Sequence, residues 1–446
     1  MKSPWVGWGS RHNSPCLPLR FPITIRRIPM SADRIHSTYR IETAHPLEEA
    51  AAVMAGEQSS GTFIAVPGET DALRERFGAR IESIHEEDRV DAPSLPGSRQ
   101  PAGRSLRRAL VTLSFPVDNI GPSLPNLMTM VAGNLFELSP FSGMRLLDIE
   151  LPDSFAREFP GPAFGISGTR KLAGVSDRPI LGTIVKPSVG LSPDETASLA
   201  RTLAEAGLDF IKDDELIANP PYSPLKERVR CVMRILRDHA DRTGKLVMYA
   251  FNITDEPDAM LRHHDTVREA GGSCVMVSMI SAGLSAVAHL RRHASLPIHG
   301  HRNGWGMLAR HPLAGMEYAA FQKLFRLAGA DHFHVNGLRN KFCEEDASVI
   351  RSAQTCLQPF AGTPPVMPVF SSGQSASQAP DTYAALQSVD LMYICGGGIL
   401  GHPDGVAAGV QSLREAWEAA VAGVPLETYA RERPALARAL QTFQRT

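Results

Sequence analysis

The 446-residue sequence has few cysteines, and none of them are grouped. The six cysteines are scattered, without a CxxC pair or the Cys/His spacing of a zinc site. We therefore expect neither a disulfide framework nor structural zinc, and the pattern favours the reducing cytoplasm. Long apolar runs are also missing: none approaches the roughly 18 residues of a membrane-spanning helix, so no membrane partner is expected.

An excess of charge of one sign is absent as well. The 46 Lys and Arg residues nearly balance the 47 Asp and Glu residues, and the formal net charge is −1. General nucleic-acid binding requires a positive surface, so nucleic acid is not an expected partner. A hydrophobic share of 43% and a charged share of 21% are typical of a globular protein with a large core. The length allows two or three domains, or a large barrel with a smaller domain.

Residues 1–30 contain no acid and show no hydrophobic period, but they are rich in Pro, Arg and Trp. The alternatives are a targeting peptide and a disordered extension, translated from upstream of a true start at Met30. A signal peptide would carry an apolar core followed by a small-residue cleavage site. Because this sequence has no such core, we expect a disordered extension.

Residues 31–160 mix strand and helix patterns. STYRIET and RSLRRALVTLSFP read as strands, and HPLEEAAAVMAG between them reads as a helix that runs into a Gly/Ser turn. Interleaved strands and helices predict an α+β sandwich. The Pro- and Gly-rich residues 91–105 are expected to form an exposed loop.

Eight short apolar runs follow, each with a helical pattern after it. They are PILGTIVKPS (179–188), LDFIKDD (208–214), KLVMYAFNI (245–253), SCVMVSMIS (273–281), LPIHGHR (296–302), DHFHVNG (331–337), PPVMPVFSSG (364–373) and LMYICGGG (391–398). Ser192 is a predicted helix N-cap, with Pro193 in the first turn and Gly207 after the end. This alternation indicates a (β/α)₈ barrel over residues 161–430, with residues 431–446 as a C-terminal tail.

Polar residues follow these runs at the point where each strand should end. They are Lys186, Lys212, Asp214, Glu215, His301, Arg302, His332, His334, Ser371, Ser372 and Gly396 to Gly398. The carboxyl ends of barrel strands meet at one mouth, where barrel enzymes carry their active sites. The convergence predicts a site there.

The stretch DFIKDDE (209–215) places a lysine among acids. Strand alternation puts Lys212 and Asp214 on one face and Asp213 on the other, so we expect Asp213 to be structural. Two interpretations remain open from these residues alone. Lys212 is either one partner of an ordinary ion pair or a lysine whose pKa burial lowers, although the neighbouring acids raise it.

The sequence resembles ribulose-bisphosphate carboxylase (RuBisCO) and the RuBisCO-like proteins over roughly residues 36–430. The motifs that carry the resemblance are EQSSGT (57–62), GNLF (133–136), GTIVKP (182–187), GLDFIKDDE (207–215), HGHR (299–302), GADHFHVNGLRNK (329–341) and CGGGILGHPDG (395–405). The resemblance implies a ferredoxin-like N-terminal α+β domain, a C-terminal barrel, and a homodimer, or a multiple of dimers, with shared active sites.

The resemblance also implies a metal site. In the family, the lysine that matches Lys212 takes up CO₂ as a carbamate and becomes an oxygen ligand. With Asp214 and Glu215 it would hold one Mg²⁺ per site, leaving positions for water and substrate. Lys186 matches a lysine that moves protons near the enediolate, and His301 matches another polar group close to the metal.

The remaining residues implied by the resemblance bind substrate. Gly373, Gly396 and Gly397, with Ser372, would cradle a phosphate, and Thr62 of the partner subunit would join them. Arg302, His334 and Ser371 correspond to a second anion site, which a ligand with one phosphate would leave to a carboxylate or to hydroxyls. Lys341 lies on a loop that closes over substrate; Glu57 of the other subunit would pair with it, and Asn134 would reach the metal-bound ligand.

Departures from the family pattern argue against carbon fixation. Ser188 stands where carboxylases have a second lysine, and Trp305 stands where they have a histidine. Ile184 replaces a threonine, and Ser372 replaces a glycine. The lost lysine and histidine remove charge and proton-transfer capacity.

We nevertheless expect the site to keep its metal and to form an enolate, with a keto-sugar phosphate as the substrate. Our leading hypothesis is a Mg²⁺-dependent decarboxylase of an oxo-sugar acid phosphate, such as 3-oxo-isoapionate 4-phosphate, in which Lys186 or a water on the metal protonates the enolate. An isomerase or enolase of methylthio-sugar phosphates in methionine salvage is an open alternative, favoured if Trp305 forms an apolar wall. A non-catalytic sugar-phosphate-binding protein is the alternative of another class.

Overall fold

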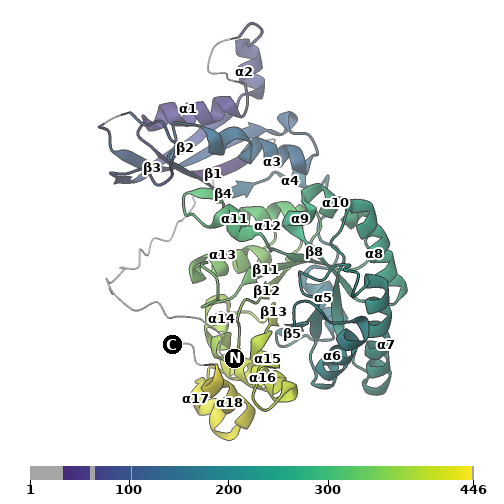
Figure 1. The fold of residues 1–446 in the computed structure, drawn as a ribbon. Helices are drawn as coiled ribbons and strands as arrows, with labels where there is room; N and C mark the ends of the chain where they lie inside the picture. Colours follow the sequence, from purple (N-terminus) through teal and green to yellow (C-terminus); the bar gives the residue numbers. More distant parts are fainter. Residues whose placement is uncertain (1–33, 61–65, 102, 444–446) are drawn as a thin grey trace. The chain divides into compact units, whose positions relative to one another are not determined.

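The computed structural model describes residues 34–60, 66–101 and 103–443 (Figure 1). The expected extension 1–30 and the predicted phosphate-binding residue Thr62 lie outside the described residues. None of the described helices combines the length and hydropathy that a bilayer span needs.

The N-terminal domain is built on a five-stranded sheet. Its strands are β1 (Arg34–Thr43), β2 (Arg80–Val90), β3 (Leu106–Pro116), β4 (Gly143–Glu150) and the short β10 (Ala314–Met316). The order is β10-β4-β1-β3-β2, and β1 is antiparallel to both β3 and β4. Helices α1 (Leu47–Glu57), α2 (Asp71–Phe77) and α3 (Leu124–Ala132) lie between these strands in sequence. The arrangement of the first four strands is that of a ferredoxin-like split βαβ domain, as predicted.

Strand β10 joins this sheet although it comes from the barrel segment of the chain. It pairs in parallel with β4, with Gly315 opposite Arg145. Gly315 has φ 78°, and a Cβ atom there would lie 1.7 Å from the carbonyl oxygen of Leu308. Only glycine fits this conformation and this space.

We expect Gly315→Ala to lower the free energy of unfolding by about 2–4 kcal/mol, the combined effect of a positive φ and a steric clash. Urea unfolding would measure the loss. Gly306→Ala in α11 (Trp305–Ala309) is the matched control, since nothing lies within 4 Å of a Cβ atom there. Equal stability of the two variants would contradict the expectation.

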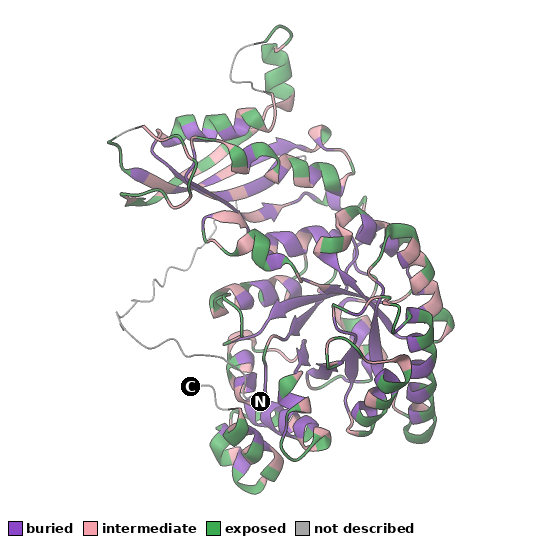
Figure 2. Ribbon diagram, in the orientation of Figure 1, coloured by how far each residue is buried: buried purple, intermediate pink, exposed green. Residues whose placement is uncertain are grey.

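Eight parallel strands form a closed barrel, as the sequence predicts. They are β5 (Ile180–Ile184), β6 (Phe210–Lys212), β7 (Met248–Asn252), β8 (Cys274–Ser278), β9 (Ile298–His301), β11 (His332–Asn336), β12 (Met367–Phe370) and β13 (Met392–Ile394). These strands are buried almost without interruption, because helices cover their outer face and side chains fill the interior (Figure 2). This two-sided burial explains why they read as continuous apolar runs.

A helix follows each barrel strand. These helices are α6 (Pro193–Glu205), α7 (Leu225–Thr243), α8 (Pro257–Glu269), α10 (Leu284–His293), α12 (Tyr318–Leu327), α13 (Asp346–Leu357), α14 (Ala379–Leu386) and α16 (Val406–Ala422). The predicted N-cap Ser192 is confirmed: its side chain accepts from the Glu195 amide, and the Glu195 carboxylate accepts from the Ser192 amide. This capping box fixes where α6 begins.

Two further segments complete the barrel domain. Helix α5 (Gly165–Ala173) precedes β5 and packs Ile166, Leu172 and Ala173 against apolar side chains of the barrel strands. The predicted C-terminal tail contains helix α18 (Pro434–Thr442), whose Leu436 and Ala439 are buried. The Leu436 amide also donates to the Glu415 carboxylate on α16.

Candidate active site

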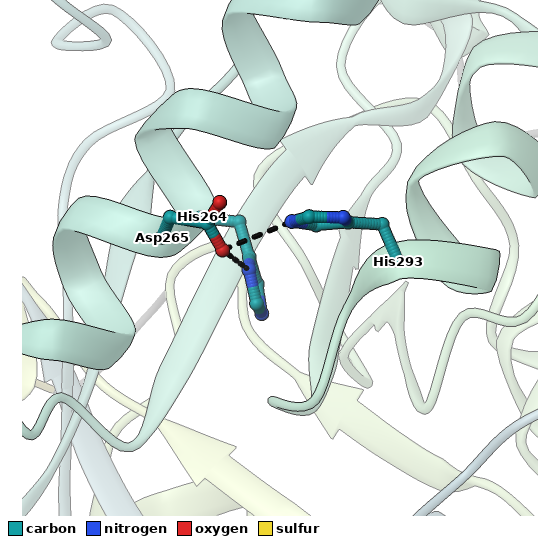
Figure 3. Close-up of side chains that lie close together, drawn as sticks. All are labelled: His264, Asp265 and His293. Carbon is teal, nitrogen blue, oxygen red and sulfur yellow. Dashed lines mark hydrogen bonds and ion pairs between the residues drawn. The ribbon is translucent and has the colours of Figure 1, made fainter.

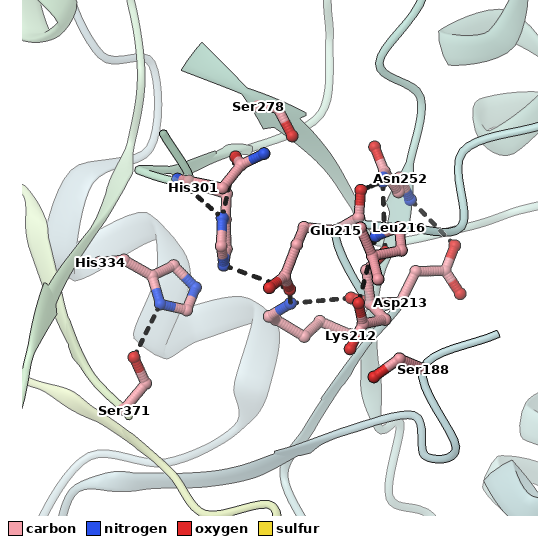
Figure 4. A network of polar contacts seen from close by, with 12 residues as sticks. Ser188, Lys212, Asp213, Glu215, Leu216, Asn252, Ser278, His301, His334 and Ser371 are labelled. Atoms are coloured by element: carbon pink, nitrogen blue, oxygen red, sulfur yellow. Dashed lines mark hydrogen bonds and ion pairs between the residues drawn. The ribbon is translucent and has the colours of Figure 1, made fainter. Parts of the chain in front are cut away.

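Lys212 is the last residue of β6, and its side chain is completely buried. Its Nζ atom donates to the Asp213 carbonyl at 2.8 Å and lies 3.7 Å from the Glu215 carboxylate (Figure 4). Burial lowers the pKa of Lys212 most, although Glu215, Asp214 and Asp213 raise it. Burial therefore outweighs three acids and favours the neutral amine, the form that can react with CO₂.

Asp214 is held by Lys186, not by Lys212. Lys186 Nζ donates to the Asp214 carboxylate and to the Ser188 hydroxyl, at 2.6 Å in each case. The Lys186 side chain is 42% exposed, whereas Asp214 is buried. Ser188, at the position of the missing second lysine, thus orients the lysine that remains.

Asp213 points away from Asp214, as the strand alternation predicts. Its carboxylate accepts from Arg228 Nε and Nη2, from the Tyr249 hydroxyl and from the Asn252 amide, at 2.6–3.2 Å. The Asn252 side chain also donates to the carbonyl oxygens of Asp214 and Glu215. This buried network fixes the backbone that carries the two acids of the mouth.

His301, at the end of β9, faces Glu215. The Asn303 amide donates to His301 Nδ1 at 3.2 Å, and His301 Nε2 lies 3.5 Å from the Glu215 carboxylate. His301 Nδ1 also lies 3.1 Å from the Asn303 side-chain carbonyl. Burial lowers the pKa of His301 to about 4, so the ring is neutral at neutral pH. Burial raises the pKa of Glu215, but His301 and Lys212 outweigh that effect and lower it. Asp214 and Glu215 thus offer carboxylate oxygens, which suit Mg²⁺.

Arg302 lies in a second part of the mouth, where it stacks on an aromatic ring and forms an ion pair with a carboxylate. Its guanidinium carbon lies 4.0 Å from the centroid of the Tyr318 ring, and Nη2 donates to Glu344 at 2.8 Å. Its buried Nη1 has no hydrogen-bond partner among the described residues. Glu344, which no sequence motif pointed to, also accepts from the Asn336 side-chain amide at 2.6 Å.

Trp305, considered above as an apolar wall for a ligand, is only 6% exposed. It packs against the rings of Tyr318 and Phe321 in α12, with centroids 5.1 and 4.8 Å away. The indole therefore supports the residues around Arg302 and presents little surface to a ligand.

The end of β12 carries two hydroxyls. Ser371 Oγ lies 3.0 Å from His334 Nδ1, and Ser372 Oγ donates to the Asn336 side-chain carbonyl at 2.8 Å. Ser372 has φ 69°, a left-handed conformation that favours glycine, the residue that carboxylases have at this position. Gly373 follows with φ 91°, and Cβ atoms at Gly396 and Gly397 would meet open space. Bare backbone is therefore present at both predicted phosphate loops.

Among the described residues, the side chains of Glu57, Asn134 and Lys341 form no hydrogen bond or ion pair with the residues of this mouth. Glu57 and Asn134 lie together in the N-terminal domain, where the Asn134 amide donates to Glu57 at 3.3 Å. The Lys341 side chain is exposed, with Nζ 5.2 Å from the centroid of the Phe342 ring. The Lys341 amide donates to the Ser372 carbonyl at 3.1 Å, which ties this loop to the end of β12.

A second group of metal-ligand types lies outside the barrel mouth: His264, Asp265 and His293 (Figure 3). The Ser295 amide donates to His264 Nε2 at 3.1 Å, and burial lowers the pKa of His264. The neutral ring thus carries its proton on Nδ1, which faces Asp265 at 3.2 Å. A cation would need the lone pair that this proton occupies, so the group is a hydrogen-bond network between α8 and α10.

Comparisons with known proteins agree with this geometry. Residues 28–155 match the family model of the ribulose bisphosphate carboxylase large chain N-terminal domain, and residues 165–443 match that of its catalytic domain. A rubisco-like protein from Burkholderia fungorum has a crystal structure similar to this one, with a TM-score of 0.87 and 49% identity, over 92% of this chain and 100% of that chain.

Two similar relatives have names that state a reaction. A protein of Xanthobacter autotrophicus named 3-oxo-isoapionate-4-phosphate transcarboxylase/hydrolase is 55% identical over 411 residues, 92% of this chain and 99% of that protein. A protein of Rhizobium rhizogenes named 3-oxo-isoapionate-4-phosphate decarboxylase is 47% identical over 409 residues, 91% of this chain and 97% of that protein.

Proposed function

This chain belongs to the ribulose bisphosphate carboxylase large chain family, and from that premise we propose that it is a RuBisCO-like decarboxylase of 3-oxo-isoapionate 4-phosphate. The observation that carries the proposal is the set Lys212, Asp214 and Glu215 at the end of β6, with Lys186 bonded to Asp214. The replacement of a second lysine by Ser188 separates this chain from the carboxylases, as the sequence indicated.

The donor set fits Mg²⁺ once Lys212 has reacted with CO₂. The neutral Nζ forms a bond to the carbon of CO₂ and one N–H proton leaves to solvent, which gives an anionic carbamate. The residues that would hold the ion are this carbamate, Asp214 and Glu215. When bound, Mg²⁺ supplies positive charge that polarises the substrate ketone and lowers the cost of an enolate.

The chain's own residues carry the proton chemistry. In decarboxylation the bond between the substrate carbon and its carboxylate breaks, CO₂ leaves, and the electron pair enters the enolate. The carbon then takes a proton, and Lys186 is the donor we propose, since its Nζ is partly exposed at the mouth and is oriented by Asp214 and Ser188. His301 faces Glu215, with Nε2 3.5 Å from its carboxylate.

We propose that the two ends of the mouth bind different groups of the substrate. The bare backbone of Gly373, Gly396 and Gly397 is proposed to bind the single phosphate. The unpaired Nη1 of Arg302 and the Ser371–His334 pair are left for the carboxylate and hydroxyl groups.

We further propose a homodimer in which Glu57, Thr62 and Asn134 of the partner subunit complete each site. This proposal is supported by the proximity of Glu57 and Asn134, which lie together in the N-terminal domain and could enter one site as a pair. The cysteines of the described residues are free thiols, which suits the cytoplasm.

The experiment is turnover of 3-oxo-isoapionate 4-phosphate that carries an isotope label in its carboxyl group, with Mg²⁺ and bicarbonate present. Release of labelled CO₂ supports the decarboxylase. Label retained in a hydrolysed product supports transcarboxylation, the second candidate, which the 55% identical relative favours. Solvent deuterium uptake without cleavage would indicate an isomerase or enolase, and binding without any reaction would indicate a non-catalytic binder.

Lys186→Met is expected to lower kcat by about 10²–10⁴-fold, the usual contribution of a positioned proton donor. Steady-state CO₂ release measures the effect. Lys226→Met on the exposed side of α7 is the control and should keep full activity. Unchanged turnover in Lys186→Met would remove Lys186 from the proton transfer.

A further inference from the structure

A line of histidines connects the mouth of the barrel to helix α5. His334 Nε2 lies 2.7 Å from His299 Nε2, and His299 Nδ1 lies 3.2 Å from His332 Nδ1. His332 Nε2 in turn lies 2.9 Å from the Thr169 hydroxyl on α5. At the mouth, His334 Nδ1 contacts Ser371 Oγ at 3.0 Å (Figure 4).

The Thr169 end of this line sets the direction of every hydrogen bond. The Thr169 hydroxyl donates to the Gly165 carbonyl oxygen, which can only accept. Thr169 must therefore accept from His332, whose proton is on Nε2. His332 Nδ1 is then an acceptor, so His299 donates to it from Nδ1 and accepts from His334 at Nε2. His334 is left with a bare Nδ1, and Ser371 must donate its proton to it.

The three rings hold one proton each, because all three are buried. Burial lowers the pKa of His332 to about 3 and lowers the pKa values of His299 and His334 well below the ordinary range. Phe210 stacks on His299 with centroids 5.2 Å apart and meets His332 edge-on. Packed apolar surroundings thus keep the rings neutral and in place, so each has one donor and one acceptor nitrogen.

We infer that Thr169 is a positioning residue: through His332, His299 and His334 it turns the Ser371 proton away from the ligand and makes Ser371 a hydrogen-bond acceptor at the mouth. The Ser372 hydroxyl is also a donor within the protein, because it donates to the Asn336 side-chain carbonyl. The Asn336 side-chain amide in turn donates to Glu344, which fixes its orientation. Both serines therefore offer lone pairs to a ligand.

The direction of the Ser371 hydrogen bond affects which group of the ligand can bind there, an inference that rests on the proposed function. The acceptor oxygen of Ser371 repels a doubly charged phosphate and suits a hydroxyl group that donates to it. The unpaired Nη1 of Arg302, which is linked to the serines through Glu344 and Asn336, can bind a carboxylate or ketone oxygen. The mouth at Ser371 thus selects a hydroxyl-bearing end of the substrate over a second phosphate.

The test is the tautomer of His334, measured by long-range proton–nitrogen NMR on protein labelled at histidine. The His334 signal is identified by its loss in His334→Gln. We expect a proton on Nε2 of His334 in the unchanged protein. A proton on Nδ1 would overturn the inference, and this measurement needs neither a variant of Thr169 nor any substrate.

Thr169→Val removes the acceptor at the base and is nearly the same size. The relay should reverse, so that the His334 proton moves to Nδ1 and the Ser371 proton is released toward the ligand. KM should rise about 5–30-fold, the effect of one misdirected hydrogen bond, with a smaller change in kcat. Thr169→Ser keeps the hydroxyl and should restore both the tautomer and KM.

A Thr169→Val protein that keeps the proton on Nε2 would contradict the inference, whatever its stability or activity. Because the tautomer is observed without turnover, the inference about Thr169 can fail or hold independently of the proposed reaction. If the protein fails to turn over 3-oxo-isoapionate 4-phosphate while the tautomers are as expected, only the substrate assignment is wrong.

Discussion

Lys212→Met is expected to abolish CO₂-dependent Mg²⁺ binding and to lower turnover by about 10⁴-fold or more, because several kcal/mol of charge stabilisation in the transition state depend on the metal. Methionine fills the buried space but cannot form a carbamate. Isothermal titration with Mg²⁺, with and without bicarbonate, measures the binding. Mass spectrometry after chemical trapping would locate the added CO₂ on Lys212.

Activation by CO₂ at Lys212 should depend on pH. CO₂ reacts with the neutral amine, and burial lowers the pKa of Lys212 below its ordinary value of 10.5. Activation should therefore increase as pH rises through the lowered pKa and fall as pH drops below it. The free energy of unfolding of Lys212→Met, measured in parallel, shows whether the variant is folded under the conditions of the titration. Bicarbonate-stimulated Mg²⁺ binding that persists in Lys212→Met would rule out the carbamate.

Arg228→Met is expected to give the largest loss of stability, about 3–5 kcal/mol of the free energy of unfolding. Arg228 and Asp213 are both fully buried, and their closest N–O distance is 3.1 Å. Removing Arg228 leaves the Asp213 carboxylate in the protein interior with two hydrogen-bond donors among the described residues, the Tyr249 hydroxyl and the Asn252 amide. Chemical denaturation monitored by circular dichroism measures the loss.

Arg230→Met is the matched control, two residues away on the same helix. Arg230 pairs with Glu227 on the surface, where solvent screens the charges, and its removal should leave the denaturation midpoint unchanged. Because Asp213 adjoins the two acids of the mouth, Arg228→Met should also weaken Mg²⁺ binding. Equal midpoints for both variants would show that the buried pair contributes nothing.

The sequence predicted the barrel well because each parallel strand is buried on two sides and leaves an uninterrupted apolar run. The helix start at Ser192 was predictable because its capping partner, Glu195, lies only three residues away in the chain. The family motifs, in addition, placed Lys186, Lys212, Asp214 and Glu215 at strand ends, where the structure has them.

What the sequence could not predict depends on contacts between residues far apart in the chain. Arg228 as the partner of Asp213 required the packing of α7 on the barrel, and Glu344 as the partner of Arg302 required the loop after β11. The histidine relay required Thr169, which lies 163 positions before His332. Lone histidines on apolar strands gave no signal of a shared hydrogen-bond direction.

Strand β10 is synthesised long after β4, the strand it pairs with, and this delay affects how the N-terminal sheet forms. The ribosome completes β4 before it makes barrel strands β5 to β9, and only then β10, which covers the edge of β4. Until that point the Arg145 guanidinium lacks its acceptors at His311, Ala314 and Glu317. Until β10 is made, the nascent N-terminal sheet therefore carries an open edge that other chains can pair with. A fragment that ends at residue 160 would keep that edge open, a site for pairing between chains.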